Sequence, residues 1–208
     1  MNAFASSADN VVSLANPRRA ATRARICYAA NVLFFDQGFA AVTMEEIAEA
    51  AGIRRSTLYL HFRDKEEILA GIAEDYTAKL GPIVARLPGP VPTHAQIAAW
   101  VDEMADFVMR EPASTELLVS LSHLPKAPAP ALAFGSAFKD MMAGRLAAFR
   151  RALEPGEVLA FARAMAAVDG LGWALCHHAR AGGDKVSKAR LTVAADALNS
   201  FVRGDDQA

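Results

Sequence analysis

The sequence has few of the residues on which several classes of protein depend. It contains two cysteines in 208 residues, Cys27 and Cys176, with no CxxC or zinc-type spacing, which excludes a disulfide framework and a structural zinc site. Both lie in apolar, helix-like surroundings, so we expect them to be buried as small hydrophobic residues. Runs of β-branched residues are scarce and no alternating apolar–polar pattern persists, which excludes an extensive sheet.

Signals for export, membrane insertion and catalysis are also missing. The N-terminal segment lacks a basic stretch followed by an apolar core, and no uninterrupted apolar run reaches the roughly 18 residues of a membrane span. No nucleophile elbow, phosphate loop, dinucleotide fingerprint or metal-binding His pair occurs. The groups available for catalysis are His123, His177, His178, Cys176, Asp169 and Glu157. We therefore expect a cytoplasmic protein that is not an enzyme and needs no cofactor or metal.

What the sequence does contain is helix-forming and apolar. It is 53% hydrophobic and rich in alanine, and apolar residues recur at helical spacing, which predicts an all-α fold of about nine helices. The net charge of −1 alone argues against a nucleic-acid partner. The charge is segregated, however, because residues 17–65 hold eight Lys and Arg against five Asp and Glu. The small basic excess lies at the N-terminal end.

Within that basic end, the stretch from Thr43 to Lys65 is typical of a helix-turn-helix. Thr43 and Glu46 have the spacing of a capping box before a first helix from Met44 to Ala51. Gly52 supplies the left-handed backbone of a sharp turn. A second helix is expected from about Arg55 to Phe62, with Leu58 and Phe62 turned inward.

The outer face of this second helix is suited to the grooves of DNA. Arg, Ser, Thr, Tyr and His point outward and no acid is among them, which favours a phosphate-lined groove. The predicted DNA-binding residues are Thr43, Arg54, Arg55, Ser56, Thr57, Tyr59, His61 and Lys65. Arg54 and Arg55 are the candidates for guanine, through a two-pronged bond to O6 and N7, and the others for phosphate.

The run from Gly38 to Leu69 resembles the DNA-binding domain of TetR-type transcriptional regulators. The shared elements are Gly38-Phe39, Thr43, Ile47 to Gly52, Thr57 to Phe62 and the pair Lys65-Glu66. One position departs from the pattern, because Arg54 stands where relatives usually place a capping Ser, and arginine cannot accept a hydrogen bond from a helix N-terminus. The resemblance implies a phosphate contact for Lys65; the residues alone indicate a solvent-exposed lysine.

The resemblance also implies a division of the chain. We expect a mobile tail over residues 1–16, a three-helix DNA-binding domain over 17–80, and a helical effector-binding and dimerisation domain over 81–208. The helix that starts at Lys65 leaves the first domain and is expected to kink or stop at Gly81-Pro82. Later helices are expected over about 94–110, 114–122, 131–153, 157–181 and 185–202.

The last two helices carry more apolar surface than one chain covers, which favours a symmetric dimer through a four-helix bundle, as in the resembled family. The interface residues expected are Phe161, Gly170, Leu191, Ala195, Leu198 and Val202. A ligand pocket is expected among the C-terminal helices, lined by Met and aromatic side chains that suit an adaptable apolar cavity. Its predicted lining is Trp100, Met104, Phe107, Phe138, Met141, Met142, Met165, Asp169, Trp173 and His177. Each of these residues has an alternative interpretation as plain core, and Asp169 and His177 as a hydrogen-bonded pair at the dimer seam.

Together these features predict a ligand-responsive dimeric repressor. It would bind a near-palindromic double-stranded operator and be released when a small, largely apolar effector binds. The alternative is a DNA-binding regulator that answers to a protein partner, or to no small molecule at all. The operator sequence, the effector and the regulated genes do not follow from the residues.

Overall fold

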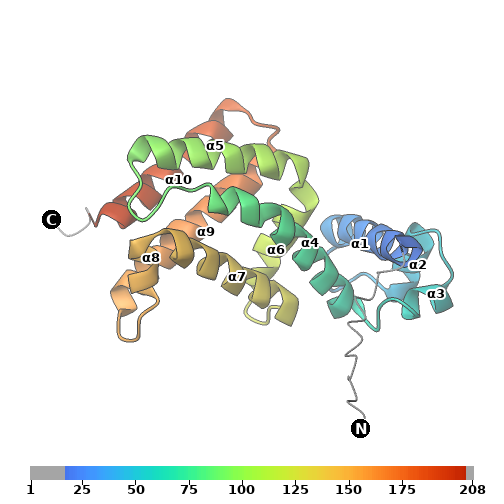
Figure 1. The fold of residues 1–208 in the computed structure, drawn as a ribbon. Helices are drawn as coiled ribbons and strands as arrows, with labels where there is room; N and C mark the ends of the chain where they lie inside the picture. The colour runs from blue at the N-terminus through green and yellow to red at the C-terminus, as the bar shows by residue number, and fades with distance from the viewer. Residues whose placement is uncertain (1–16, 205–208) are drawn as a thin grey trace, which may run out of the picture.

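The computed structural model describes residues 17–204 and is built from ten α-helices, with no strand in that range (Figure 1). The tail expected over residues 1–16 lies outside the described residues. The helices form a small N-terminal lobe and a larger C-terminal lobe, joined by one long helix. The all-α, two-part architecture predicted from the sequence is confirmed.

The small lobe consists of α1 (Pro17–Gln37), α2 (Met44–Ala50) and α3 (Arg55–Tyr59), packed against the first turns of α4 (Lys65–Ala85). Its core is formed by fully buried aliphatic and aromatic side chains, namely Ile26, Phe34, Ile47, Leu58, Phe62, Ile68 and Leu69. Gly38 ends α1 with φ of 85° and Gly52 makes the α2–α3 turn with φ of 61°, as the sequence predicted. The predicted capping box is also present, because Thr43 accepts from the amide of Glu46 and the Glu46 carboxylate accepts from the amide of Thr43.

The connecting helix α4 does not stop at Gly81-Pro82. It continues to Ala85 with Pro82 inside it, so the expected stop does not occur. Ile83 and Val84 are buried beyond the proline, and the Trp100 indole donates to the Ile83 carbonyl at 3.0 Å. These tertiary contacts offset the hydrogen bond that a proline removes. The boundary expected between residues 80 and 81 therefore falls within a continuous helix.

The larger lobe contains α5 (His94–Arg110), α6 (Pro112–Ser122), α7 (Ala129–Arg145), α8 (Ala147–Ala152), α9 (Val158–Arg180) and α10 (Lys185–Arg203). The single helix expected over residues 131–153 was wrong, because the chain breaks at Leu146 into α7 and α8. Leu146 is extended and fully buried, and Arg145 donates to the Leu87 carbonyl at 2.8 Å. Leu146 and Phe149, on either side of the start of α8, are both fully buried.

The two last helices, α9 and α10, lie against each other and pack on α5, α6 and α8. Within residues 17–204, α9 is the one helix whose length and apolar composition would suit a membrane span. Its inner face is buried in the lobe by Ala164, Leu171 and Leu175. Its outer face is lined by small and apolar residues that no other helix of the protomer covers.

Candidate nucleic-acid interface and internal cavity

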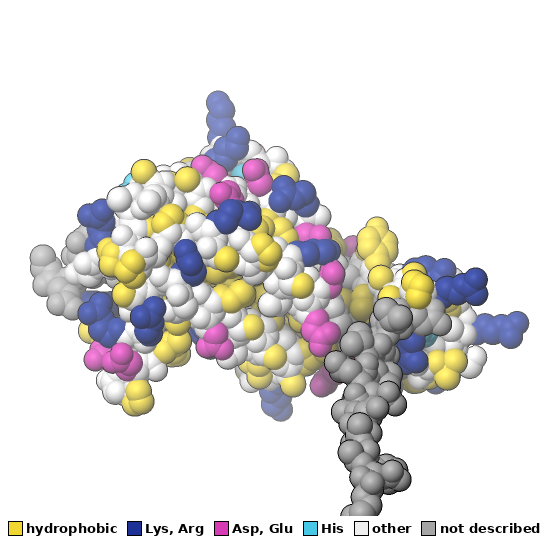
Figure 2. Space-filling view, viewed as in Figure 1, with side chains coloured by type: hydrophobic (Ala, Val, Ile, Leu, Met, Phe, Trp, Pro, Cys, Tyr) yellow, Lys and Arg dark blue, Asp and Glu magenta, His cyan; other side chains and the backbone are white. Residues whose placement is uncertain are grey.

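The outer end of the small lobe presents the side chains expected to meet DNA. Thr43, Arg54, Arg55, Ser56 and Tyr59 are exposed there, on or beside α2 and α3. On the face drawn in Figure 2, the outer end of the small lobe shows Lys and Arg without Asp or Glu, while side chains of both signs lie over the larger lobe. The helix α3 is shorter than expected, since residues 60 and 61 form a turn after Tyr59.

The two arginines at the start of α3 differ in their surroundings. Arg55 forms an exposed ion pair with Glu45 of α2, and its guanidinium lies 5.5 Å from the centre of the Tyr59 ring. A hydrogen bond to Tyr59 raises the pKa of Arg55, and the negative charge of Glu45 raises it further. Arg54 occupies the N-cap position of α3 with no side-chain cap, and it pairs with no carboxylate in the described part of the chain. Arg54 is therefore the arginine whose donors are free.

The side chain of Lys65 is directed into the small lobe. Its ammonium donates to the carbonyls of Phe39, Ala40 and Val42 at 2.8, 3.1 and 2.6 Å. An ammonium has three protons, so these bonds use all of them and fasten the α1–α2 loop to the start of α4. Neither expectation holds for this side chain, because it is neither a free surface lysine nor available to a phosphate.

The turn after α3 is braced from α1. Arg23 donates to the His61 carbonyl at 2.5 Å and its guanidinium lies 4.0 Å from the centre of the Phe62 ring. His61 was expected to face outward, but it is half-buried, and its Nδ1 has no hydrogen-bond partner among the described residues. Burial lowers the pKa of His61, and Arg19 and Arg23 lower it further. This histidine is therefore neutral near pH 7 and adds no positive charge to the surface.

The larger lobe contains a cavity of about 270 Å³ between α4, α5, α6, α7 and α9. Its inner end is apolar and closed by buried side chains of α4, α5 and α9, namely Leu80, Met104, Val108, Leu171 and Leu175. Phe134 and Phe138 of α7 form one wall. The largely apolar lining with a few polar groups is typical of a small-molecule site, and the volume lies just below the usual range.

The mouth of the cavity is polar. His123, which follows α6, bonds to Asp169 of α9 at 3.1 Å through Nε2 and to the Val119 carbonyl at 2.7 Å through Nδ1. The Val119 carbonyl, and after it Asp169, raise the pKa of His123. Lys139 of α7 lies at the same mouth, and in residues 17–204 no carboxylate pairs with it.

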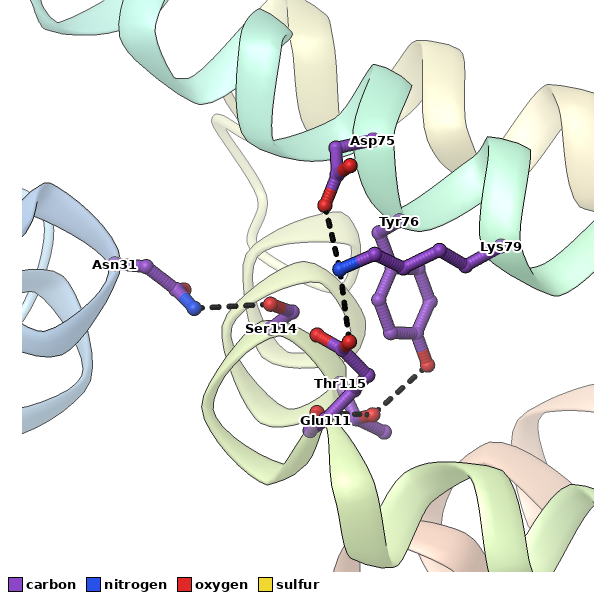
Figure 3. A network of polar contacts seen from close by, with 7 residues as sticks. All are labelled: Asn31, Asp75, Tyr76, Lys79, Glu111, Ser114 and Thr115. Carbon is purple, nitrogen blue, oxygen red and sulfur yellow. Dashed lines mark hydrogen bonds and ion pairs between the residues drawn. The ribbon is translucent and has the colours of Figure 1, made fainter. Parts of the chain in front are cut away.

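A polar network links this cavity to the small lobe through the first turn of α6 (Figure 3). Ser114 accepts a hydrogen bond from the Asn31 amide of α1 at 2.9 Å. Its neighbour Thr115 is 2.8 Å from the hydroxyl of Tyr76, which lines the cavity. Beside them, Lys79 of α4 bridges Asp75 and Glu111 at 2.8 Å each. Two adjacent residues of α6 therefore touch the small lobe on one side and the cavity wall on the other.

Known proteins share both the small lobe and the whole architecture. Residues 26–72 match the model of "Bacterial regulatory proteins, tetR family". The regulator AcrR of Shigella flexneri is 36% identical over 72 residues, which are 33% of this chain and 34% of AcrR. A TetR-like regulator from Rhodococcus sp. RHA1 has a similar structure, with a TM-score of 0.65 at 21% identity over 91% of this chain and 98% of the other. The chain belongs to the TetR family of transcriptional regulators.

The TetR-family resemblance seen in the sequence is thereby confirmed, and with it the expectation that the chain is not an enzyme. The chain spans between a quarter and a third of the length of the curated relatives AcrR, YerO and TtgR, which it matches. The solved structure of Thermus thermophilus FadR, a TetR-family repressor in complex with lauroyl-CoA, is similar over 88% of this chain and 94% of the other, with a TM-score of 0.54 at 23% identity. The sequence likeness is concentrated in the small lobe, and the likeness of the larger lobe is one of fold.

The cavity of this TetR-family chain brings together four of the ten residues expected to line it, namely Met104, Phe138, Met165 and Asp169. Trp100, Phe107 and Met142 are buried core residues that do not reach the cavity, and Met141 packs against the core. Trp173 lies outside the lining and packs against His123, with ring centres 5.5 Å apart and the ring planes tilted by 48°, and His177 is exposed. The sequence missed Tyr76, Thr115, His123 and Lys139. The one signal in the sequence that could have identified His123 is its position between the predicted helix over 114–122 and a proline-rich loop.

Four of the six expected dimer-interface residues are buried inside the protomer. Leu191, Ala195, Leu198 and Val202 form the inner face of α10 and have at most 6% of their surface exposed. They fill the core between α10, α9 and α5, so they are not available to a second subunit. Phe161 and Gly170 of α9 are exposed.

Proposed function

We propose that this TetR-family chain is a dimeric repressor that binds a near-palindromic operator and is released by a small, largely apolar effector. The observation that carries the proposal is the exposed face of α2 and α3, which the continuous helix α4 joins to a lobe with a largely apolar cavity of about 270 Å³. Such a protein acts inside the cell, where its operator lies. Repression is the simpler mode of action, because a dimer on a promoter blocks it by occupancy alone.

In this proposal Arg54 and Leu60 read bases, and the exposed polar residues set the register. Arg54 has free donors and suits guanine O6 and N7. Arg55 is held by Glu45, but an exposed ion pair contributes little stability, so DNA readily replaces the carboxylate. Thr43, Ser56, Thr57 and Tyr59 contact phosphates. Leu60, with 75% of its surface exposed at the end of α3, suits the methyl group of a thymine.

The proposed dimer uses the outer faces of α9 and α10 rather than their inner ones. On α9, exposed small and apolar residues recur at helical spacing in a stripe of Leu159, Ala162, Ala166, Gly170 and Trp173. On α10, the matching stripe consists of Val186, Ala189, Val193 and Ala197. Because α9 and α10 are neighbours, the stripes form one patch, and two copies related by a two-fold axis bury it as a four-helix bundle.

Such a dimer places two copies of α3 about 34–36 Å apart, one turn of DNA. An effector in the cavity acts on this spacing along two paths. It presses on Leu80 of α4, whose first turn carries the small lobe, and on Tyr76, which is hydrogen-bonded to Thr115 beside the Asn31–Ser114 contact. The effector shifts the equilibrium only by its difference in affinity for the two arrangements.

The test begins with selection of bound DNA fragments by the purified protein, followed by a screen of small molecules for release of the selected fragment. We expect an enriched, near-palindromic site and its release by an apolar compound. A selected site that no compound releases would favour the alternative, in which a protein partner or no effector controls binding. Absence of any enriched site would overturn the operator assignment.

A further inference from the structure

The cavity is built as a site for an amphiphile, with an apolar end deep in the lobe and a polar end at its mouth. The deep residues Leu80, Met104 and Val108 are buried. The mouth residues are accessible, since Leu132 is 54% exposed and the Asp169 side chain 47%. A ligand that enters tail first therefore leaves its head group between α6, α7 and α9. At roughly 30 Å³ per non-hydrogen atom, the volume of about 270 Å³ holds on the order of ten such atoms.

The charges at the mouth select the sign of that head group. Three charged or titratable side chains line it, namely His123, Lys139 and Asp169. Asp169 is already engaged by His123 at 3.1 Å, whereas Lys139 has no carboxylate partner in residues 17–204. For an amine head group, the one carboxylate at the mouth, Asp169, is already paired with His123, and Lys139 repels it. For an acid head group, Lys139 is an unpaired cation, and His123 already bonds to a carboxylate.

We propose that the effector is an amphiphilic monocarboxylic acid with an apolar tail of about ten carbons, and that Lys139 recognises its carboxylate at the cavity mouth. This inference rests on the proposed effector function and specifies the chemical class of the ligand. His123 and Asp169 are the neighbouring residues that set the local charge. Lys139 is the residue that determines specificity, because it is the one cation of the lining without a partner in the described chain.

The test compares ligands that share one tail and differ in the head. Binding of decanoate, decanol and decylammonium to the full chain is measured by calorimetry, below the concentration at which each forms micelles. We expect decanoate to bind most tightly and decylammonium least. Equal affinity for all three, or a preference for the amine, would overturn the proposal.

Two variants change the mouth charge in opposite directions. Lys139→Gln is expected to weaken decanoate about fivefold and Asp169→Asn to strengthen it by a similar factor, since the charges are partly exposed and screened. Neither should change the affinity for decanol. Lys126→Gln is the matched control, because Lys126 is exposed and does not line the cavity. Unaltered melting temperatures without ligand establish that each variant is folded; a decanoate affinity unaffected by Lys139→Gln would contradict the assigned role.

Decanoyl-CoA tests whether the ligand is an acyl thioester, in which a neutral thioester replaces the carboxylate. If it binds more tightly than decanoate and is unaffected by Lys139→Gln, the free-acid inference fails. The proposed function is judged separately by operator release. Release by decanol as effective as release by decanoate would sustain the effector cavity and refute the head-group inference, whereas no binding and no release by any of these ligands would count against both.

Discussion

At the scale of single residues, the structure changes the role of Lys65 most. Its ammonium satisfies three carbonyls of the α1–α2 loop. Replacement by methionine keeps the apolar stem and removes the charge, so the three carbonyls lose their donor. We expect Lys65→Met to lower the free energy of unfolding by about 1–3 kcal/mol, measured by urea denaturation. The exposed Lys126→Met is the control and should cost nothing measurable.

The salt dependence of DNA binding distinguishes this brace from a phosphate contact. A lysine that neutralises a phosphate contributes about 0.9 to the slope of log K against log salt concentration. We expect Lys65→Met to weaken operator binding through the distorted loop while leaving that slope unchanged. A slope lower by about one for each protomer would restore the phosphate contact and contradict the brace.

The two cysteines provide a second prediction at this scale. Burial raises the pKa of Cys27 to about 11 and that of Cys176 to about 12, from an ordinary value of 9.0. At pH 8 both thiols are therefore protonated, and a thiol-specific reagent should label the native protein only as fast as it opens. Above pH 9 the unfolded chain loses these protons while the folded chain keeps them. The free energy of unfolding should accordingly fall as pH rises from 9 towards 11 and 12.

Rapid stoichiometric labelling of the native protein at pH 8 would contradict the burial of these thiols. Cys27→Ala serves as the control in the alkaline titration, since it should remove the contribution of Cys27 between pH 9 and 11 and keep that of Cys176, which extends from pH 9 to about 12.

At the scale of elements, the short helix α3 lacks a side-chain cap, because Arg54 occupies its N-cap position. Arg54→Ser supplies an oxygen that accepts from the helix amides, so the small lobe should gain on the order of 1 kcal/mol in the free energy of unfolding. The same change removes the proposed guanine contact, so the DNA fragments selected by the variant should differ from those of the parent. A gain in stability with the same preferred site would contradict base reading by Arg54. Arg25→Ser, on the exposed surface of α1, is the control for loss of positive charge.

How far the sequence predicts these elements depends on how local their causes are. The caps of α2 and α5 follow from the pairs Thr43–Glu46 and Thr93–Gln96, and both capping boxes are present. The continuation of α4 past Pro82 does not follow, because it depends on Trp100, which is distant in the sequence. The cavity lining depends in the same way on how α7 and α9 face α4 and α5. Apolar periodicity locates the buried faces of helices and does not say which of them leaves a gap.

The first turn of α6 is the element on which effector and operator signals converge in the proposed mechanism. We expect Tyr76→Phe and Asn31→Ala to reduce the factor by which an effector weakens operator binding, because each breaks one hydrogen bond on either side of this turn. The coupling is reciprocal, so the operator's effect on effector affinity should fall by the same factor. Both affinities are measured with and without the other ligand.

The control for this coupling is Glu116→Gln, which breaks the ion pair of α6 with Arg180 of α9 and touches neither path. If it reduced the coupling as much as Asn31→Ala, the effect would arise from general loosening of α6. An unchanged coupling factor in Tyr76→Phe would leave α4 as the route of the signal.

At the scale of the whole molecule, the dimer is decided by which side of α10 is free. The apolar residues that recur at helical spacing on α10 are buried within the protomer. A second, less apolar stripe of alanine and valine is exposed on its other side. Sequence analysis selects the stronger stripe, because hydrophobicity alone does not distinguish the face buried against α9 and α5 from the face left for a partner. The position of α9 and α10 in the fold makes that distinction.

Charge substitutions on the two faces should therefore have different outcomes. Val193 is 67% exposed, and a glutamate there meets its two-fold copy in the proposed bundle, so Val193→Glu should give a folded monomer by light scattering. Because the small lobes of the two monomers then bind DNA independently, the affinity for the operator should fall by about a hundredfold or more. Leu198→Glu buries a charge in the core of the protomer and should unfold it, as a lost thermal transition would show. Lys188→Glu lies on another exposed face of α10 and should remain a dimer. A Val193→Glu protein that stays dimeric would move the interface away from these helices, and the spacing of the two α3 helices would have to be derived from a different two-fold axis.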